Sequence, residues 1–273
     1  MTFNLQLYQQ VWQHLDRSKV IKIPNYTISP ITLHTYNRLT STNTKLWSLI
    51  DRGATMPVGA IALEQTAGRG QWGKKWVSQP GGLYLSVALN LNLDLNNNAH
   101  LVMATAWGIA TVLRSYCLPV TIKWSNDLIL EQRKLGGIKI ETRNSKNKIV
   151  KAVVGVGINW CNQVPEVGID LQSYNYQSET KINSLEELAA ITSYGIVLGY
   201  QYYLAVGIEQ LLSNYLAILD SLGQQIIINN ITGEVIGVTT EGKLKVKMHS
   251  QTPGTSTEIT LNPGQVSLGY VFK

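Results

Sequence analysis

Two neighbouring strand patterns constrain the fold of this chain more than any other feature. Residues 135–142 and 149–159 are rich in aliphatic side chains and flank the turn-forming sequence Asn144-Ser145-Lys146-Asn147, which predicts a β-hairpin. Further strands are predicted for residues 58–64, 83–91, 120–124 and 127–130, and helices for residues 41–52, 99–116 and 184–221. Since hairpins outnumber βαβ crossovers, we expect an α+β fold whose mixed sheet is largely antiparallel.

The pattern changes after Gly223. Short strand-like segments separated by turn sequences such as Asn262-Pro263-Gly264 follow at residues 225–229, 234–240, 243–248, 258–261 and 265–270. This spacing is typical of a small all-β barrel. We therefore expect a short lead-in over residues 1–35, a main domain over residues 36–222 and a small C-terminal domain over residues 223–273.

Composition excludes several classes of protein. The 273 residues are 44% hydrophobic, which is enough for a buried core. The net charge of +6 is modest, whereas a nucleic-acid-binding protein more often has a dense basic patch. Cys117 and Cys161 lack the spacing of a zinc site or a disulfide framework, so we expect both to be buried as small hydrophobic residues. Without a secretory signal or a run of about 18 to 20 apolar residues, we expect a cytoplasmic protein.

A glycine-rich basic loop is predicted between residues 65 and 82. Its centre reads Gly68-Arg69-Gly70-Gln71-Trp72-Gly73-Lys74-Lys75-Trp76. Glycines let backbone amides approach an anion, cations neutralise phosphate, and tryptophans cover a flat ring or exclude water. The spacing matches neither a P-loop nor a Rossmann fingerprint. An ordinary solvated surface loop is the alternative.

Two adjacent stretches carry charged side chains on short strands. Their sequences are Lys123-Trp124-Ser125-Asn126-Asp127-Leu128 and Arg133-Lys134-Leu135-Gly136-Gly137-Ile138. A lysine held in a cleft beside two glycines is suited to bind a carboxylate and a phosphate together. Asp127 is suited to hold magnesium or to orient a cation. The alternative is a hairpin whose charges face solvent.

Two more stretches place small or polar residues where a ligand would lie. Gly155-Val156-Gly157-Ile158-Asn159 has glycines inside a strand, which weaken it unless another group passes close to its backbone; packing of a core strand is the alternative. Ser41-Thr42-Asn43 is typical of a helix N-cap. The same short polar groups at a positive helix N-terminus also suit a polar ligand.

Taken in this order, the stretches resemble the biotin–protein ligase family. The family patterns S-T-N, G-R-G-R-x-G-R-x-W, K-W-P-N-D-L, R-K-L-x-G-I and G-x-G-I-N have counterparts between Ser41 and Asn159, and the similarity runs from about residue 33 to the C-terminus. The resemblance implies a class II synthetase-like catalytic domain followed by an SH3-like barrel. The chain resembles the single-function type, because residues 1–40 are too short for the winged helix of the DNA-binding members.

Three departures from the family pattern affect the expected chemistry. Gln71 stands where an arginine is usual, Lys74 replaces a second arginine, and Ser125 replaces a proline. Gln71 lacks the cation expected to help hold an acyl-adenylate, and Lys74 keeps its charge without the bidentate geometry of arginine.

The resemblance implies an ATP-dependent ligase. Biotin and Mg-ATP first give biotinyl-5′-AMP and pyrophosphate. A lysine of the biotin carboxyl carrier protein of acetyl-CoA carboxylase then attacks the mixed anhydride and releases AMP. Biotin, ATP and Mg²⁺ are the expected ligands, and neither a membrane nor specific DNA is an expected partner. An exposed strand edge near the glycine-rich loop suits a homodimer or docking of the carrier.

Matching the motifs position by position implies a role for each candidate residue. Lys134 would bridge the biotin carboxylate and the α-phosphate, and Arg69 would neutralise the same region. The biotin-binding set implied is Ser41, Thr42, Asn43, Gln65, Arg69, Gly70, Gln71 and Lys134. The nucleotide-binding set implied is Gly68, Trp76, Asn126 and Asn159, with Asp127 as a metal contact or a cation orienter.

Three other functions compete with this interpretation. They are lipoyl or octanoyl transfer on a related fold, biotin-responsive DNA binding without catalysis, and nucleotide binding without turnover. The Gly-Arg-Gly loop and the C-terminal barrel favour biotin over lipoyl groups, and the short N-terminal region argues against DNA binding.

Overall fold

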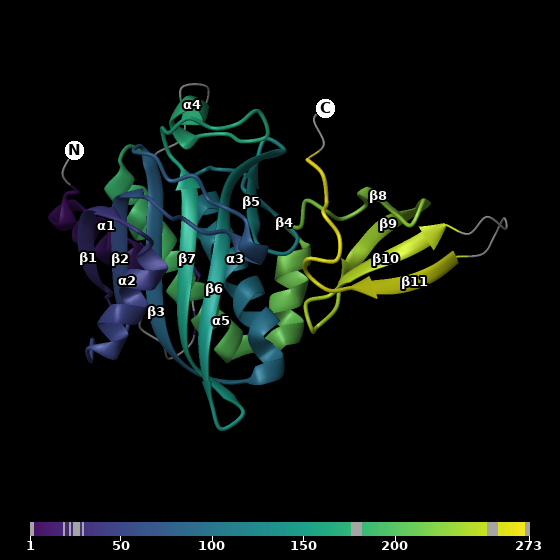
Figure 1. Cartoon of the computed structure of the whole chain (residues 1–273), viewed down its shortest axis with the longest axis horizontal. Coiled ribbons are helices and arrows are strands. Elements are labelled where there is room, and N and C mark those ends of the chain that lie inside the picture. Colours follow the sequence, from purple (N-terminus) through teal and green to yellow (C-terminus); the bar gives the residue numbers. More distant parts are fainter. Residues whose placement is uncertain are drawn as a thin grey trace.

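The computed structural model describes residues 3–18, 20–21, 23, 28, 30–175, 182–249 and 256–270. Its main feature is a seven-stranded sheet in the order β1-β2-β3-β7-β6-β5-β4 (Figure 1). The strands are β1 (Thr32–Leu39), β2 (Val58–Gln65), β3 (Gly82–Asp94), β4 (Thr121–Lys123), β5 (Asp127–Leu130), β6 (Arg133–Ser145) and β7 (Lys148–Asn159). β1 and β2 run parallel and the other neighbours run antiparallel, so the prediction of a mixed, largely antiparallel sheet is confirmed.

The predicted hairpin is the pair β6 and β7. Ser145 lies opposite Lys148, and the two residues between them, Lys146 and Asn147, have φ angles of 47° and 59°. Two successive residues with positive φ make the tight turn that matches the twist of antiparallel strands. The hairpin therefore forms for the reason that the sequence suggested.

The helices cover the two faces of the sheet unequally. α3 (Asn98–Ser115) and α5 (Leu185–Leu216) pack on one face, together with α1 (Leu5–Ser18), and form the larger core. Leu46 and Ile50 of α2 (Thr42–Asp51) pack against Val58, Ala60 and Val153. The strand neighbours of these last three residues belong to the larger core, so α2 lies on the opposite face. Figure 1 shows α2 in front of the sheet and α3 and α5 behind it.

α5 begins with a capping box at Ser184 and Glu187. The Glu187 backbone N–H donates to Ser184 Oγ at 3.1 Å, and Glu187 Oε2 accepts from the Asn183 backbone N–H at 2.8 Å. These contacts satisfy amide groups that lack helical partners. The short helices are α4 (Leu171–Asn175), η1 (Gln71–Gly73) and η2 (Leu95–Asn97).

The lead-in region contains a helix that the sequence interpretation missed. α1 spans Leu5–Ser18 and buries Tyr8, Trp12 and Leu15. These positions follow helical spacing, so all three side chains lie on one face. The Tyr8 hydroxyl also shares a hydrogen bond of 2.9 Å with Ser193 Oγ of α5. α1 therefore belongs to the main core.

The C-terminal region forms a four-stranded antiparallel sheet in the order β11-β10-β9-β8 (yellow-green in Figure 1). Its strands are β8 (Gln225–Ile228), β9 (Ile231–Val238), β10 (Leu244–His249) and β11 (Ser256–Leu261). The predicted fifth strand is wrong, because residues 265–270 form no strand. That segment instead runs beside β4 and β5 (Figure 1), so the described strands do not close into a barrel.

The two cysteines are not buried. Cys117 and Cys161 are both free thiols with exposed side chains, and the prediction that they act as small core residues is wrong. Cys117 has a φ of 62° in the turn that ends α3, and Cys161 follows directly after β7. Both positions lie in connections, where side chains face outward more often than in strands or helices.

The small sheet docks against α3 and α5 through a buried histidine. His100 lies in the first turn of α3 and is 8% exposed. Its Nδ1 shares a hydrogen bond of 2.9 Å with the Tyr203 hydroxyl of α5, and its Nε2 one of 2.9 Å with the Thr240 carbonyl oxygen. Trp124 Nε1 also donates to the Gly242 carbonyl oxygen at 3.0 Å. The turn at residues 239–242 is therefore anchored by polar contacts.

This anchor predicts a pH-dependent stability. Burial lowers the pKa of His100 below its usual value, although the Thr240 carbonyl and the carboxylates of Glu241 and Glu209 oppose the shift. The unfolded chain then binds a proton more readily than the folded chain below the usual histidine pKa, so the free energy of unfolding falls as pH decreases through about 6.5.

Urea denaturation at pH 7.5 and pH 5.5 measures this effect. We expect His100→Gln to lose less stability over this interval than the wild type. His14→Gln, at an exposed position of α1, should keep the wild-type dependence. An unchanged pH dependence in His100→Gln would contradict the assignment.

Candidate active site

One cavity of about 350 Å³ collects residues from all the motif-bearing stretches. It lies on the face of the sheet that carries α2, and residues from β6 and β7 contribute to its lining. The candidate residues that line it are Ser41, Thr42, Asn43, Gln65, Arg69, Gly70, Gln71, Trp76, Asn126, Asp127, Lys134 and Asn159. The fold therefore brings together groups that are more than 100 positions apart in the chain.

Gly68 is the candidate residue that does not line the cavity. A β-carbon at this position would lie 2.4 Å from both Ser78 Oγ and the Trp76 carbonyl oxygen. The Trp76 backbone N–H donates to the Gly68 carbonyl oxygen at 3.0 Å. Gly68 thus lets the two arms of the glycine-rich loop approach each other.

The glycine-rich loop is internally bonded. The Gly70 backbone N–H donates to the Lys74 carbonyl oxygen at 2.7 Å, and Arg69 pairs with Lys75 in an isolated bridge. Trp72 at the tip of the loop is 67% exposed, and its ring lies about 3 Å from where a β-carbon of Gly264 would stand. The C-terminal region therefore contacts the tip of the loop.

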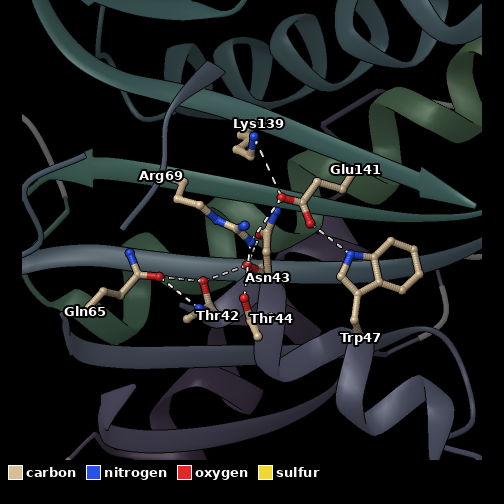
Figure 2. Close-up of polar contacts among 9 residues, drawn as sticks. Thr42, Asn43, Thr44, Trp47, Gln65, Arg69, Lys139 and Glu141 are labelled. Carbon is tan, nitrogen blue, oxygen red and sulfur yellow. Dashed lines mark hydrogen bonds and ion pairs between the residues drawn. The ribbon is translucent and has the colours of Figure 1, made fainter. Parts of the chain in front are cut away.

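The start of α2 forms one wall of the cavity. Gln65 Oε1 accepts from the Thr42 backbone N–H at 2.9 Å, and Ser86 Oγ contacts Thr42 Oγ1 at 2.7 Å and Asn43 Oδ1 at 2.6 Å. Figure 2 shows the Gln65 amide directed at Thr42. Ser41 occupies the N-cap position, but its side chain makes no capping hydrogen bond and faces the cavity instead.

Asn43 has an unsatisfied amide group in this wall. The residue is 5% exposed and its Nδ2 is buried without a hydrogen-bond partner among the described residues. A buried donor without a partner costs free energy, of order 1 to 3 kcal/mol. Because Asn43 also lines the cavity, this amide is available to a polar ligand.

The strand glycines of β7 allow two side chains to approach the sheet. A β-carbon at Gly155 would lie 2.3 Å from Asn43 Oδ1, and one at Gly157 would lie 2.5 Å from the Trp76 ring. Both distances are too short for any larger residue. The expectation that a group passes close to these glycines is confirmed.

Lys134 on β6 sits at the other end of the cavity in a chain of polar contacts. Its Nζ donates to Asp127 Oδ1 at 2.8 Å and lies 5.5 Å from the centre of the Trp76 ring. Asp127 Oδ2 accepts from the Tyr270 hydroxyl at 2.8 Å. Sequence reasoning missed Tyr270, because its segment was predicted as a barrel strand remote from the main sheet.

Lys123 lies under the same tyrosine. It is 6% exposed, and its Nζ stands 3.4 Å from the centre of the Tyr270 ring. Burial lowers the pKa of Lys123 to about 8. The nearby charges of Lys134 and Lys74 act in the same direction, whereas the carboxylates of Asp127 and Asp220 raise the pKa. The ring therefore covers a buried amine next to the Lys134–Asp127 ion pair.

The candidate amides hold the backbone around Lys134. Asn126 Nδ2 donates to the Ile138 carbonyl oxygen at 2.8 Å, and Gln71 Nε2 donates to the same oxygen at 3.3 Å. Asn159 Nδ2 donates to the Lys134 carbonyl oxygen at 3.2 Å. These side chains fix the position of β6, whose Lys134 faces the cavity.

A second group of missed residues surrounds the Arg69 side chain. Arg69 Nη2 lies 3.3 Å from Glu141 Oε1 and donates to Thr44 Oγ1 at 3.2 Å. Trp47 Nε1 donates to Glu141 Oε2 at 2.9 Å (Figure 2). Glu141 lies near the end of the strand predicted over residues 135–142 and Trp47 inside the helix predicted over residues 41–52, and neither belongs to a motif.

Neither a protein metal centre nor a membrane segment is found in the described part of the chain. No group of three or more histidine, cysteine, aspartate or glutamate side chains is close enough there to hold a metal ion. No described helix is long and apolar enough to cross a membrane. The cavity instead combines cations, amides and indole rings, which suits an anionic ligand with a flat ring system.

Part of this chain is similar in sequence to known proteins. Residues 35–159 match the model of the biotin/lipoate A/B protein ligase family. The bifunctional ligase/repressor BirA of Escherichia coli (strain K12) is 35% identical over 140 residues, which cover 50% of this chain and 43% of that protein. The biotin–[acetyl-CoA-carboxylase] ligase of Paracoccus denitrificans is 31% identical over 134 residues, which cover 48% and 55%. This chain therefore spans only about half the length of either relative.

A solved structure shares the fold over most of the chain. The biotin protein ligase from Aquifex aeolicus, in complex with biotin and ATP, superimposes with a TM-score of 0.64 at 24% sequence identity. The match covers 84% of this chain and 95% of that one. The two proteins thus share the arrangement of sheet and helices over more of this chain than residues 35–159.

The Tyr270 contact can be tested by stability measurements. Tyr270→Phe removes the hydroxyl from Asp127 and keeps the ring over Lys123, so we expect the free energy of unfolding to fall by about 1 kcal/mol. Tyr36→Phe is a matched control, because that ring also lies near a lysine, Lys45, and its hydroxyl has no hydrogen bond within the described residues. Equal stabilities of the two variants in urea denaturation would contradict the role of the hydroxyl.

Proposed function

Because residues 35–159 of this chain form a domain of the biotin/lipoate A/B protein ligase family, we propose that the protein is an ATP-dependent biotin ligase. It activates biotin as biotinyl-5′-AMP and transfers the biotinyl group to a lysine of a biotin carboxyl carrier protein of acetyl-CoA carboxylase. The observation that carries the proposal is the convergence of all five motif stretches on one cavity whose lining includes both Arg69 and Lys134.

The reaction requires two negatively charged groups to meet. The biotin carboxylate attacks the α-phosphate of ATP, pyrophosphate leaves, and the mixed anhydride remains. Lys134 is the residue that stabilises this approach, since it lines the cavity and its ammonium group is held by Asp127. A fixed cation in a site with little water lowers the barrier more than the same cation does in bulk water.

Biotin occupies the end of the cavity formed by α2 and the glycine-rich loop. Its ureido ring is a neutral group with both donors and acceptors, which matches Ser41, Thr42, Gln65 and the unsatisfied amide of Asn43. Gly70 and Gln71 lie along the tail of the ligand. Arg69 neutralises the biotin carboxylate and, after the first step, the phosphate to which it is joined in the mixed anhydride. These roles agree with the polar character of that wall.

The nucleotide occupies the end near Trp76 and Asn126. Trp76 offers a flat apolar surface above Gly157, whereas Asn126 and Asn159 act by bracing β6 rather than by binding with free amide groups. Gly68 acts through the shape of the loop. The loop then covers the adenylate and excludes water, because an acyl phosphate hydrolyses readily.

Asp127 acts as a cation orienter. Its two oxygens accept from Lys134 and Tyr270, which supports this role over that of a magnesium ligand. Magnesium enters with ATP and is held chiefly by the phosphate oxygens, as is common for this ion in nucleotide sites.

The remaining parts of the proposal concern organisation and partners. Residues 36–222 form the catalytic domain and residues 223–273 a C-terminal domain that contacts the glycine-rich loop and Asp127. The protein acts in the cytoplasm on the carrier protein and binds no specific DNA. The free edge of the sheet serves homodimer formation or carrier docking.

A transfer assay tests the proposed activity directly. The protein is incubated with Mg-ATP, a carrier domain and either biotin or lipoate, and the carrier is weighed by mass spectrometry. We expect one biotinyl group per carrier and no lipoyl group. Transfer of lipoate instead of biotin, or of neither, would refute the proposal.

Lys134→Ala should abolish the first step of the reaction. We expect pyrophosphate release to fall by about a thousandfold while the chain stays folded, because Lys134 lines a cavity rather than the core. Lys148→Ala is the control, since Lys148 forms an exposed ion pair with Asp94 at the far end of the hairpin. Pyrophosphate release from Lys134→Ala at the rate of the control would show that the role assigned to Lys134 is wrong.

Gln71→Arg should retain the adenylate longer. An arginine adds a charge-assisted contact with the phosphate, so we expect the intermediate to dissociate about tenfold more slowly than from the wild type. The measurement is the release of radiolabelled biotinyl-5′-AMP after rapid dilution. Equal dissociation rates would remove the idea that Gln71 loosens the site.

A further inference from the structure

The guanidinium group of Arg69 is held from one side only. Nη2 makes both of its polar contacts, to Glu141 Oε1 and to Thr44 Oγ1. Neither Nε nor Nη1 donates a hydrogen bond to any residue in the described ranges. Arg69 lines the cavity, whereas Glu141 and Thr44 do not. The two partners therefore hold the group from outside the cavity and leave its Nε and Nη1 donors for a ligand.

Glu141 is itself held in place by several contacts. Oε2 accepts from Trp47 Nε1 at 2.9 Å, and Lys139 Nζ lies 3.8 Å from Oε1. Figure 2 shows Trp47, Lys139 and Arg69 reaching this carboxylate from three directions. Its side chain is 23% exposed, compared with 51% for Arg69, so the carboxylate is the more fixed partner of the ion pair.

The tryptophan that orients Glu141 is anchored in turn. The Arg143 guanidinium carbon lies 4.3 Å from the centre of the Trp47 ring, and Arg143 also forms an ion pair with Asp51 of α2. These contacts tie α2 to β6. A charged group supported in this way loses less rotamer freedom when it binds a partner than an isolated surface side chain does.

We propose that Glu141 is a positioning residue, which with Thr44 presents the free Nε and Nη1 donors of Arg69 to the acidic end of biotin and of its adenylate. The inference rests on the proposed function and assigns a role to two residues that do not line the cavity. With Nη2 occupied, the Nε–H and Nη1–H groups remain as donors, and each can give a charge-assisted hydrogen bond to a carboxylate or phosphate oxygen. Without Glu141, Arg69 would sample many rotamers at the cavity rim and bind the anion less well.

Binding measurements with two ligands test the proposal. Isothermal titration calorimetry gives dissociation constants for biotin, which carries a carboxylate, and for biotinol, its neutral alcohol analogue. In Glu141→Gln we expect biotin to bind about three- to tenfold more weakly and biotinol to bind as in the wild type. Glu64→Gln is the matched control, because Glu64 forms an exposed ion pair with Arg38 on the neighbouring strand.

A double-mutant cycle adds a second criterion. In the Arg69→Gln background, Glu141→Gln should cause no further loss of biotin affinity, since the residue acts through Arg69. Additive losses, equal weakening of biotin and biotinol, or unchanged or tighter biotin binding in Glu141→Gln would each overturn the proposal.

The same measurements separate the proposal from the proposed function. A wild type that binds biotin but transfers none would refute the proposed activity and leave the binding comparison valid. A wild type that binds neither ligand would overturn both.

Discussion

The ion pair between Lys134 and Asp127 is the contact on which the site depends. This ion pair joins β6 to β5. Its carboxylate accepts a hydrogen bond from the Tyr270 hydroxyl of the C-terminal segment, and Lys134 lines the cavity. The Asp127 carboxylate accepts one hydrogen bond from the Lys134 ammonium group and leaves two of the ammonium protons for a ligand.

The floor of the cavity depends on two glycines of β7, which have no side chains. Gly155 and Gly157 leave room on β7 for Asn43 and Trp76, so groups from α2 and the glycine-rich loop can lie directly on the sheet. Burial against the sheet leaves Asn43 Nδ2 without a hydrogen-bond partner among the described residues. The cost of that unsatisfied donor is recovered when a ligand with an acceptor binds, which links the packing of the strand to the binding of the proposed ligand.

The sequence predicted six of the seven strands of the main sheet and the helices α2, α3 and α5, because apolar periodicity is a local property, whereas β1 was missed. The motifs also pointed to twelve of the residues that line the cavity. Tyr270 and Glu141 were missed because their roles depend on contacts across more than 70 positions of the chain. The fifth strand at residues 265–270 was wrong for a related reason. Its alternating pattern is compatible with a strand, yet contact with Asp127 and burial of Leu268 against the main domain stabilise an irregular path.

A crystal structure with biotin and a non-hydrolysable ATP analogue tests the central claim most directly. The account predicts that Lys134 Nζ lies within about 3 Å of both the biotin carboxylate and an α-phosphate oxygen. An occupied cavity in which that ammonium group turns toward bulk solvent, away from both ligands, would contradict it.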